Sequence, residues 1–122
     1  MFTDDKPLFQ QVADLICSDI LRGTYAEGDQ VSSTNDFAAF YRINPATAGK
    51  GINLLVDQEI LYKKRGIGMF VAQGAREKLL ATQQGEFMEK YVAEFVTQAR
   101  ALGLNLERVQ ELIAKEYRDG NS

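Results

Sequence analysis

The fold is decided by residues 42–71, which read RINPATAGKGINLLVDQEILYKKRGIGMFV. Asn44 is a residue type that caps helices, and Pro45 suits the first helical position, where its missing N–H group costs nothing. From there the apolar residues Ala48, Ile52 and Leu55 recur at helical spacing, which predicts a helix with one buried face. The polar residues on the opposite face are Thr47, Lys50 and Asn53.

After this helix the pattern changes to that of a tight β-hairpin. Residues 60–62 (ILY) and 69–71 (MFV) predict two strands, and residues 65–68 (RGIG) predict the turn between them. A helix followed by a hairpin with a basic tip is the outline of a winged helix-turn-helix, and this shape suits duplex DNA.

Two further helices are predicted before residue 42. Pro7 opens the first, which ends at Gly23. Its apolar face consists of Leu8, Val12, Leu15, Ile16 and Ile20. Residues 24–31 are predicted as a turn, after which Ser32 or Ser33 can cap a short helix that contains Phe37. The gap of residues 41–43 between this helix and the next fits a helix-turn-helix.

The composition is that of one globular domain and argues against an enzyme. The chain has 122 residues, of which 45% are hydrophobic and 25% charged. Because it contains no histidine and one cysteine, catalytic triads, histidine metal sites and cysteine clusters are excluded. The glycines at 66 and 68 are too close together for a nucleotide-binding loop. We therefore expect no metal site, no cofactor and no enzyme activity, and we interpret Cys17 as a packing residue.

The sequence also predicts a soluble, cytoplasmic protein. No uninterrupted apolar stretch approaches the ~20 residues that a membrane-spanning helix needs. The acidic residues Asp4 and Asp5 are unlike the basic start of a signal peptide. We expect no membrane partner.

The charge distribution is more informative than the net charge. The whole chain carries −3, with a sequence pI near 5.0, which argues weakly against nucleic acid. Between Arg42 and Arg65, however, five basic and two acidic side chains give a local charge of +3. The basic residues 63–65 alone could be the solvated tip of an ordinary hairpin. Next to the predicted helix at Pro45, they favour a DNA-binding surface.

The C-terminal part is predicted to form two helices. Apolar residues recur at helical spacing from Ala75 to Gly103, and Asn105 can cap a last helix that ends near Tyr117. An antiparallel pair of helices leaves apolar surface that a second copy could cover. The residues of this expected dimer interface, the apolar stripe, are Phe87, Met88, Tyr91, Val92, Phe95, Leu102, Val109, Leu112 and Ile113. The alternative is an effector pocket, although two helices are expected to leave little volume for one.

The fold expected from these patterns is mainly α with a small β-hairpin. Residues 1–74 would form an N-terminal winged helix-turn-helix, and residues 75–122 a two-helix C-terminal dimerisation region. Residues 72–76, AQGAR, are interpreted as a short hinge between them.

Together these motifs resemble the GntR-type bacterial transcription regulators, most closely their short YtrA-like branch. Residues 7–13 (PLFQQVA) are similar to the opening motif of the family, and residues 65–71 (RGIGMFV) to its wing. Smaller matches are Gly23, Gly28-Asp29, Ser33, Asn44-Pro45, Thr47 and Leu102-Gly103-Leu104. The resemblance implies a homodimeric repressor. Two-fold symmetry would pair it with a palindromic operator.

Several positions depart from the family pattern. Ser32 replaces a usual proline, and Asn35 stands where the family commonly places a DNA-contacting arginine. Gly49 and Gly51 are expected to weaken the third helix by roughly 0.5–1 kcal/mol each relative to alanine. Glu59 replaces a glycine, so the left-handed helix end that glycine permits is open to remodelling.

The expected DNA contacts combine the third helix, the start of the second and the wing. Lys50 would carry most of the contact in the major groove, and Arg65 would reach the groove beside the wing. The full set is Ser33, Asn35, Arg42, Asn44, Ala46, Thr47, Lys50, Arg65, Gly66 and Gly68. Hairpin geometry alone is the alternative explanation for the two glycines.

A protein of another class remains compatible with the sequence: a winged-helix module that binds proteins and has lost DNA binding. The acidic net charge, Asn35 and the two glycines of the third helix motivate this alternative. The sequence identifies no small-molecule effector.

Overall fold

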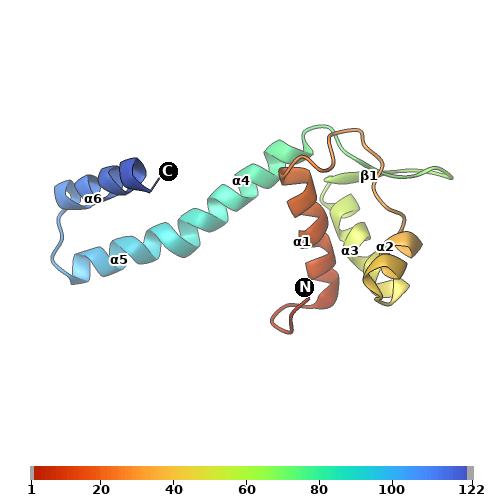
Figure 1. Cartoon of the computed structure of the whole chain (residues 1–122), viewed down its shortest axis with the longest axis horizontal. Helices are drawn as coiled ribbons and strands as arrows, with labels where there is room; N and C mark the ends of the chain where they lie inside the picture. Colours follow the sequence, from red (N-terminus) through yellow and green to blue (C-terminus); the bar gives the residue numbers. More distant parts are fainter. Residues whose placement is uncertain (1, 121–122) are drawn as a thin grey trace. The chain divides into compact units, whose positions relative to one another are not determined.

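The structure, a computed structural model, describes residues 2–120 and divides into two compact units between Thr82 and Gln83. The order of elements in the first unit is α1 (Leu8–Leu21), α2 (Thr34–Tyr41), α3 (Pro45–Asp57), β1 (Leu61–Lys64) and β2 (Gly68–Val71), as Figure 1 shows. They are followed by α4 (Ala75–Phe87), the π-helix η1 (Met88–Val92), α5 (Ala93–Ala101) and α6 (Leu106–Asp119). The predicted fold, mainly α with one β-hairpin, is confirmed.

The core of the first unit is formed by the predicted apolar faces. Helix α3 packs against both α1 and α2, and the antiparallel hairpin β1–β2 projects beside them (Figure 1). The residues buried between these elements include Val12, Ile16, Ile20, Phe37, Ala38, Ala48, Ile52, Leu55, Leu61 and Val71. Each large aliphatic side chain contributes about 1.5–3 kcal/mol when it is fully buried.

The helix ends follow the predicted capping residues. The Ser33 hydroxyl accepts a hydrogen bond from the Asp36 N–H at 3.1 Å, and Asn44 Oδ1 accepts one from the Ala46 N–H at 2.8 Å. Gly23, with φ of 84°, follows the end of α1. These local interactions place the starts of α2 and α3, which the predicted DNA surface requires.

The segment over residues 24–31, which was predicted as a turn, forms backbone hydrogen bonds to strand β2. The Val31 N–H donates to the Met69 carbonyl at 2.9 Å, and Gly28 N–H donates to the Val71 carbonyl at 2.8 Å. Gln30 and Phe70 form an antiparallel β-bridge. The hairpin is therefore flanked by a third extended segment on the outer edge of β2.

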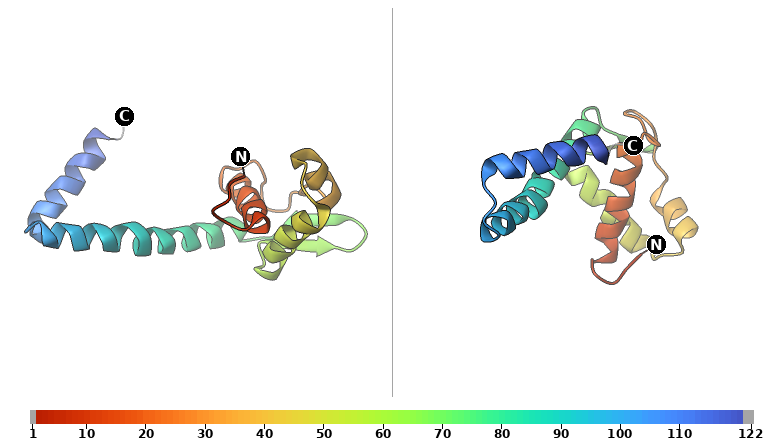
Figure 2. Two further views of the ribbon diagram at one scale, coloured as in Figure 1. Left: turned by 90° about the horizontal axis from the view of Figure 1, so that it is seen from below. Right: turned by 60° about the vertical axis from the view of Figure 1, so that its left-hand side comes forward.

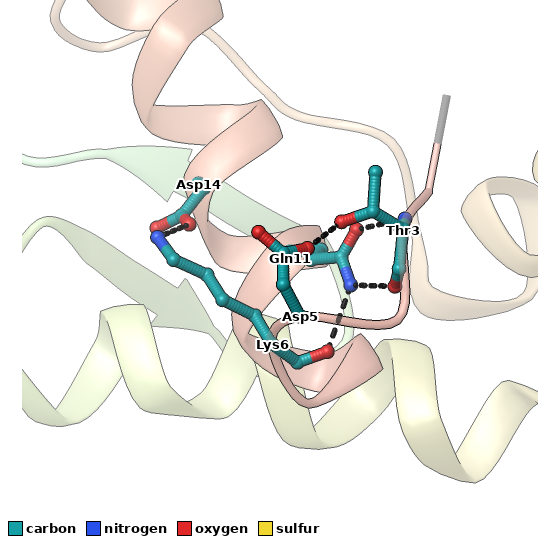
Figure 3. A network of polar contacts seen from close by, with 5 residues as sticks. All are labelled: Thr3, Asp5, Lys6, Gln11 and Asp14. Carbon is teal, nitrogen blue, oxygen red and sulfur yellow. Dashed lines mark hydrogen bonds and ion pairs between the residues drawn. The ribbon is translucent and has the colours of Figure 1, made fainter.

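The N-terminal residues are held against α1 by side-chain hydrogen bonds (Figure 3). Gln11 Nε2 donates to the carbonyls of Thr3 at 2.6 Å and Lys6 at 2.8 Å, and Gln11 Oε1 accepts from the Thr3 N–H at 2.8 Å. Lys6 forms an ion pair with Asp14 at 3.0 Å. The Thr3 hydroxyl donates to the Asp5 carboxylate and lowers the pKa of Asp5. Gln11 thus fixes the path of the chain into α1.

Residues 72–76 are anchored to the first unit, contrary to the hinge predicted there. Ala75 is fully buried in the core of this unit. The Gly74 N–H donates to Glu27 Oε1 at 2.9 Å, and Arg76 Nη2 donates to the Leu21 carbonyl at 3.2 Å. The predicted division at residue 74 marks the start of α4, whereas the compact units divide after Thr82.

The second unit contains the later part of the first predicted C-terminal helix, which begins in the first unit, and all of the second helix. The first is interrupted by the π-helix η1, whose wider turn changes the facing of the residues that follow. Asn105 Oδ1 accepts from the Arg108 N–H at 2.8 Å and caps α6, as predicted. After Gly103 the chain reverses, so that α6 runs back beside α5 while diverging from it (Figure 2).

The apolar stripe of this unit is largely solvent-exposed. Met88 is 62% exposed and Tyr91 58%, whereas Val109 is half-buried. An open groove of about 400 Å³ lies between α5 and α6 and is lined by residues that include Phe95, Ala99 and Leu112. The expectation that two helices leave little volume is therefore wrong, because α6 diverges from α5.

Candidate nucleic-acid interface

The exposed face of α3 is centred on Lys50. Ala46, Lys50 and Asn53 are exposed, and Thr47 is half-buried. Lys50 Nζ lies 4.1 Å from the centroid of the Phe9 ring, and an open groove of about 570 Å³ runs between Phe9 and this face of α3. A cation over an aromatic ring is stabilised by about 0.5–1 kcal/mol at an exposed site. Phe9, which sequence reasoning did not identify, therefore holds the Lys50 ammonium at the surface.

The two glycines of α3 differ in their surroundings, which corrects the expectation that both weaken the helix. Gly51 is buried, and a Cβ atom there would lie 2.5 Å from the Phe9 carbonyl oxygen and 2.8 Å from Val12 Cβ. Its missing side chain lets α3 approach the backbone of α1. Gly49 has space, since a Cβ atom there would lie 3.4 Å from Thr34 Cγ2.

The start of α2 lies beside the middle of α3, as the approach of Thr34 to Gly49 shows. Ser33 and Asn35, which flank Thr34, are both exposed. Arg42 is exposed in the turn between the helices, with a left-handed φ of 57°. The start of α2 thus lies next to α3, and whether Ser33, Asn35 and Arg42 act together with Lys50 stays a prediction.

Helix α3 ends in the left-handed conformation that glycine would favour, although the residue there is Glu59. Its φ is 62°, and the Ile60 and Glu59 N–H groups donate to the carbonyls of Leu55 at 2.9 Å and Val56 at 3.0 Å. The possible remodelling of this end does not occur. A non-glycine residue in this conformation costs about 1–2 kcal/mol.

The wing consists of β1, β2 and the turn between them. Lys64 pairs with Gly68 in the antiparallel register, and residues 65–67 form the exposed tip. Lys64 Nζ lies 4.6 Å from the centroid of the Phe70 ring. The last lysine of β1, next to the tip, thus lies over an aromatic ring of β2.

The wing glycines serve the hairpin itself. Gly66 has φ of 76° at the turn and open space around it. Gly68 has φ of 145°, and a Cβ atom there would lie 2.5 Å from Gln30 Nε2. These observations favour hairpin geometry as the reason for both glycines, and a close approach to DNA stays a prediction. Gln30 was not identified by sequence reasoning, because its position gives no local signal.

Two other features bear on the class of protein. Within residues 2–120, no helix is long and apolar enough to cross a membrane. In the same range, no cluster of three or more aspartate, glutamate or cysteine side chains could hold a metal ion. Cys17 packs against the core, and burial raises the pKa of its thiol to about 11, with a smaller contribution from Asp14.

A three-helix core, with Lys50 on the exposed face of α3, and a basic-tipped hairpin define a winged helix-turn-helix domain. No protein-family model matches the chain. Among curated proteins, the uncharacterized HTH-type transcriptional regulator YhcF of Bacillus subtilis (strain 168) is 28% identical, over 98% of this chain and 96% of YhcF. The HTH-type transcriptional repressor YtrA of the same organism is 24% identical, over 88% of this chain and 82% of YtrA.

Solved structures agree with these relatives. A GntR-family regulator from Bacteroides thetaiotaomicron is 32% identical, with a TM-score of 0.76 over 91% of this chain and 96% of that one. The DNA-binding domain of AraR in complex with an operator is 28% identical, with a TM-score of 0.55 over 59% of this chain and 93% of that one. The chain belongs to the GntR family of winged helix-turn-helix transcription regulators. Its relatives are regulators and not enzymes.

Proposed function

We propose that this chain binds a palindromic operator as a homodimer in the cytoplasm and represses transcription. The observation that supports the proposal is that Lys50, the start of α2 and Arg42 in the turn after it are all exposed, with Thr34 of α2 next to Gly49 of α3. The operator complex of the AraR domain and the repressor YtrA support it. Repression rather than activation is proposed because the relative YtrA is a transcriptional repressor.

The N-terminal half of α3 would enter the major groove. Thr47 and Lys50 would reach bases or phosphates, and the N-terminus of α3 would favour a phosphate. Asn44 Oδ1 caps the helix, so its side chain would contact DNA through its remaining amide group. Ser33 and Asn35 would contact the flanking backbone, and Arg65 would reach the groove beside the wing.

The apolar stripe would be covered by a second copy. Its exposed residues lie from the end of α4 through η1 and α5 to Leu102, and along α6, and large exposed apolar surfaces mark interaction sites. A closed two-fold dimer buries the same surface on both copies and presents two equivalent winged domains. Two such domains would require two half-sites of opposite orientation, which is a palindrome.

A selection of fragments from the source genome tests this function. The purified protein and its Lys50→Ala, Arg65→Ala double variant would each be incubated with fragmented genomic DNA, and bound fragments sequenced. We expect the native protein alone to enrich a palindromic sequence. If neither protein enriches any sequence, the chain is a protein-binding scaffold instead.

A further inference from the structure

The side chain of Gln30 joins the loop before α2 to the tip of the wing. Gln30 Nε2 donates to the Ile67 carbonyl oxygen at 3.0 Å, across a separation of 37 residues. Its backbone lies in the segment bridged to β2 at Phe70. Gln30 therefore reaches from the outer edge of β2 to the turn that contains Arg65.

The contact depends on the glycine at position 68. A Cβ atom on Gly68 would lie 2.5 Å from Gln30 Nε2, so the carboxamide occupies the space that a side chain would fill. Within the hairpin, the Ile67 N–H donates to the Lys64 carbonyl at 2.9 Å. Ile67 is thus held from two sides, by β1 through its N–H and by Gln30 through its carbonyl.

The hydrogen bond between Gln30 and Ile67 is important because the wing is small. Its strands contain four residues each, and two-stranded hairpins are marginally stable on their own. A wing tip that moves freely must be ordered when it binds, and this ordering lowers affinity. Fixing Ile67 restricts the neighbouring turn before DNA arrives.

We propose that Gln30 is a positioning residue for the wing, which holds the tip in the orientation that Arg65 needs to reach DNA. The part of this proposal that concerns DNA contact rests on the proposed function. The part that concerns the order of the wing in the free protein does not depend on DNA binding. Gln30 acts here through the Ile67 carbonyl and touches no nucleotide itself.

The test uses Gln30→Met, which keeps the length and apolar stem of the side chain but removes the donor. The matched control is Gln73→Met, the same change at an exposed position after β2. In the free protein, we expect the ¹⁵N heteronuclear NOE of Ile67 and Gly68 to fall in Gln30→Met and to remain unchanged in Gln73→Met. Equal values in all three proteins would overturn the proposal, whether or not the protein binds DNA.

Binding to the selected operator provides the second arm. We expect Gln30→Met to weaken binding about 3- to 10-fold and Gln73→Met to leave it unchanged. A double-mutant cycle with Arg65→Ala tests whether Gln30 acts through Arg65. In the Arg65→Ala protein, Gln30→Met should change the affinity for the operator less than two-fold, which is roughly the error of a double-mutant cycle. A full, independent loss in that background would contradict a positioning role. Failure of the native protein to bind any DNA would refute the proposed function, and the free-protein NOE would still decide whether Gln30 orders the wing.

Discussion

Replacing each glycine of α3 by alanine separates the packing of this helix from its intrinsic propensity. Gly49→Ala and Gly51→Ala lie two positions apart in the same helix and make the same chemical change. On propensity alone, each should stabilise the protein by roughly 0.5–1 kcal/mol. The structure predicts this gain only for Gly49, where a new Cβ atom would meet Thr34 Cγ2 at an ordinary 3.4 Å.

At Gly51 the new methyl group would collide with α1. Its Cβ atom would lie 2.5 Å from the Phe9 carbonyl oxygen and 2.8 Å from Val12 Cβ, and backbone cannot move aside cheaply. Overpacking in a core costs about 1–3 kcal/mol. After the propensity gain is subtracted, we expect Gly51→Ala to destabilise the protein by about 0–2.5 kcal/mol, with a central value near 1 kcal/mol.

Urea unfolding followed by far-UV circular dichroism measures both variants. With a slope of about 1–3 kcal/mol per molar urea, the two midpoints should move in opposite directions by a few tenths of a molar or more. The slopes should match that of the native protein, which shows that the change is in stability. Equal stabilisation by both substitutions would refute the close approach of α3 to α1 at Gly51.

Four further predictions follow from individual side chains. Lys50→Ala and Arg65→Ala should each weaken operator binding in a fluorescence anisotropy assay while sedimentation shows an unchanged dimer; unaltered affinity in both would refute the contact map. Phe95→Asp should shift the dimer to monomer in sedimentation, because a charge in the apolar stripe would be buried without a partner, whereas a stable dimer would place the interface elsewhere. Glu59→Gly should raise the free energy of unfolding by about 1 kcal/mol, seen as a higher urea midpoint, because glycine adopts the left-handed conformation without strain. A lower midpoint would show that the exposed ion pair between Glu59 and Lys78, at 3.2 Å, contributes more than this strain costs. Burial raises the pKa of the partly buried Cys17 thiol from 9.0 to about 11. The native thiol at pH 8 should therefore react with a disulfide reagent about 100-fold more slowly than the urea-unfolded protein, and equal rates would contradict this burial. The same shift should leave the free energy of unfolding unchanged below pH 9 and lower it as the pH rises from 9 toward 11, because the unfolded chain then loses a proton that the native thiol keeps.

The elements of the first unit could be predicted from the sequence because their signals are local. Asn44 and Pro45 start α3, and the cap needs a partner only two residues away. The buried faces of α1 and α3 repeat at the helical period, so most of their core residues follow from spacing. Leu8 and Leu15, which were also predicted for the apolar face of α1, are only half-buried. The wing turn is likewise marked by Gly66 within a few residues of both strands.

The features that the sequence did not predict depend on residues far apart in the chain. Gly51 was interpreted as a weak point of the helix, because its contact with Phe9 lies on another element. Gln30 bonds to Ile67 across 37 residues, and no local pattern marks such a pair. At Glu59 the family comparison identified a special position but not its outcome, since the left-handed end is retained without glycine.

The π-helix η1 and the groove between α5 and α6 illustrate the same limit in the second unit. The apolar spacing from Ala75 to Gly103 fits a continuous helix, and no sequence signal marks the wider turn at Met88–Val92. The cap at Asn105 fixes where α6 begins but not the direction in which it runs from α5. The sequence therefore predicted two helices but not the space between them.

The salt dependence of operator binding tests the central claim most directly. Each phosphate contact contributes about 0.9 to the slope of log K against log salt. If a homodimer uses Lys50 and Arg65 of both copies on phosphates, the double variant Lys50→Ala, Arg65→Ala should lower the slope by about 4. A decrease near 2 would indicate that one copy binds at a time, and an unchanged slope, or no binding by the native protein even at low salt, would contradict the account.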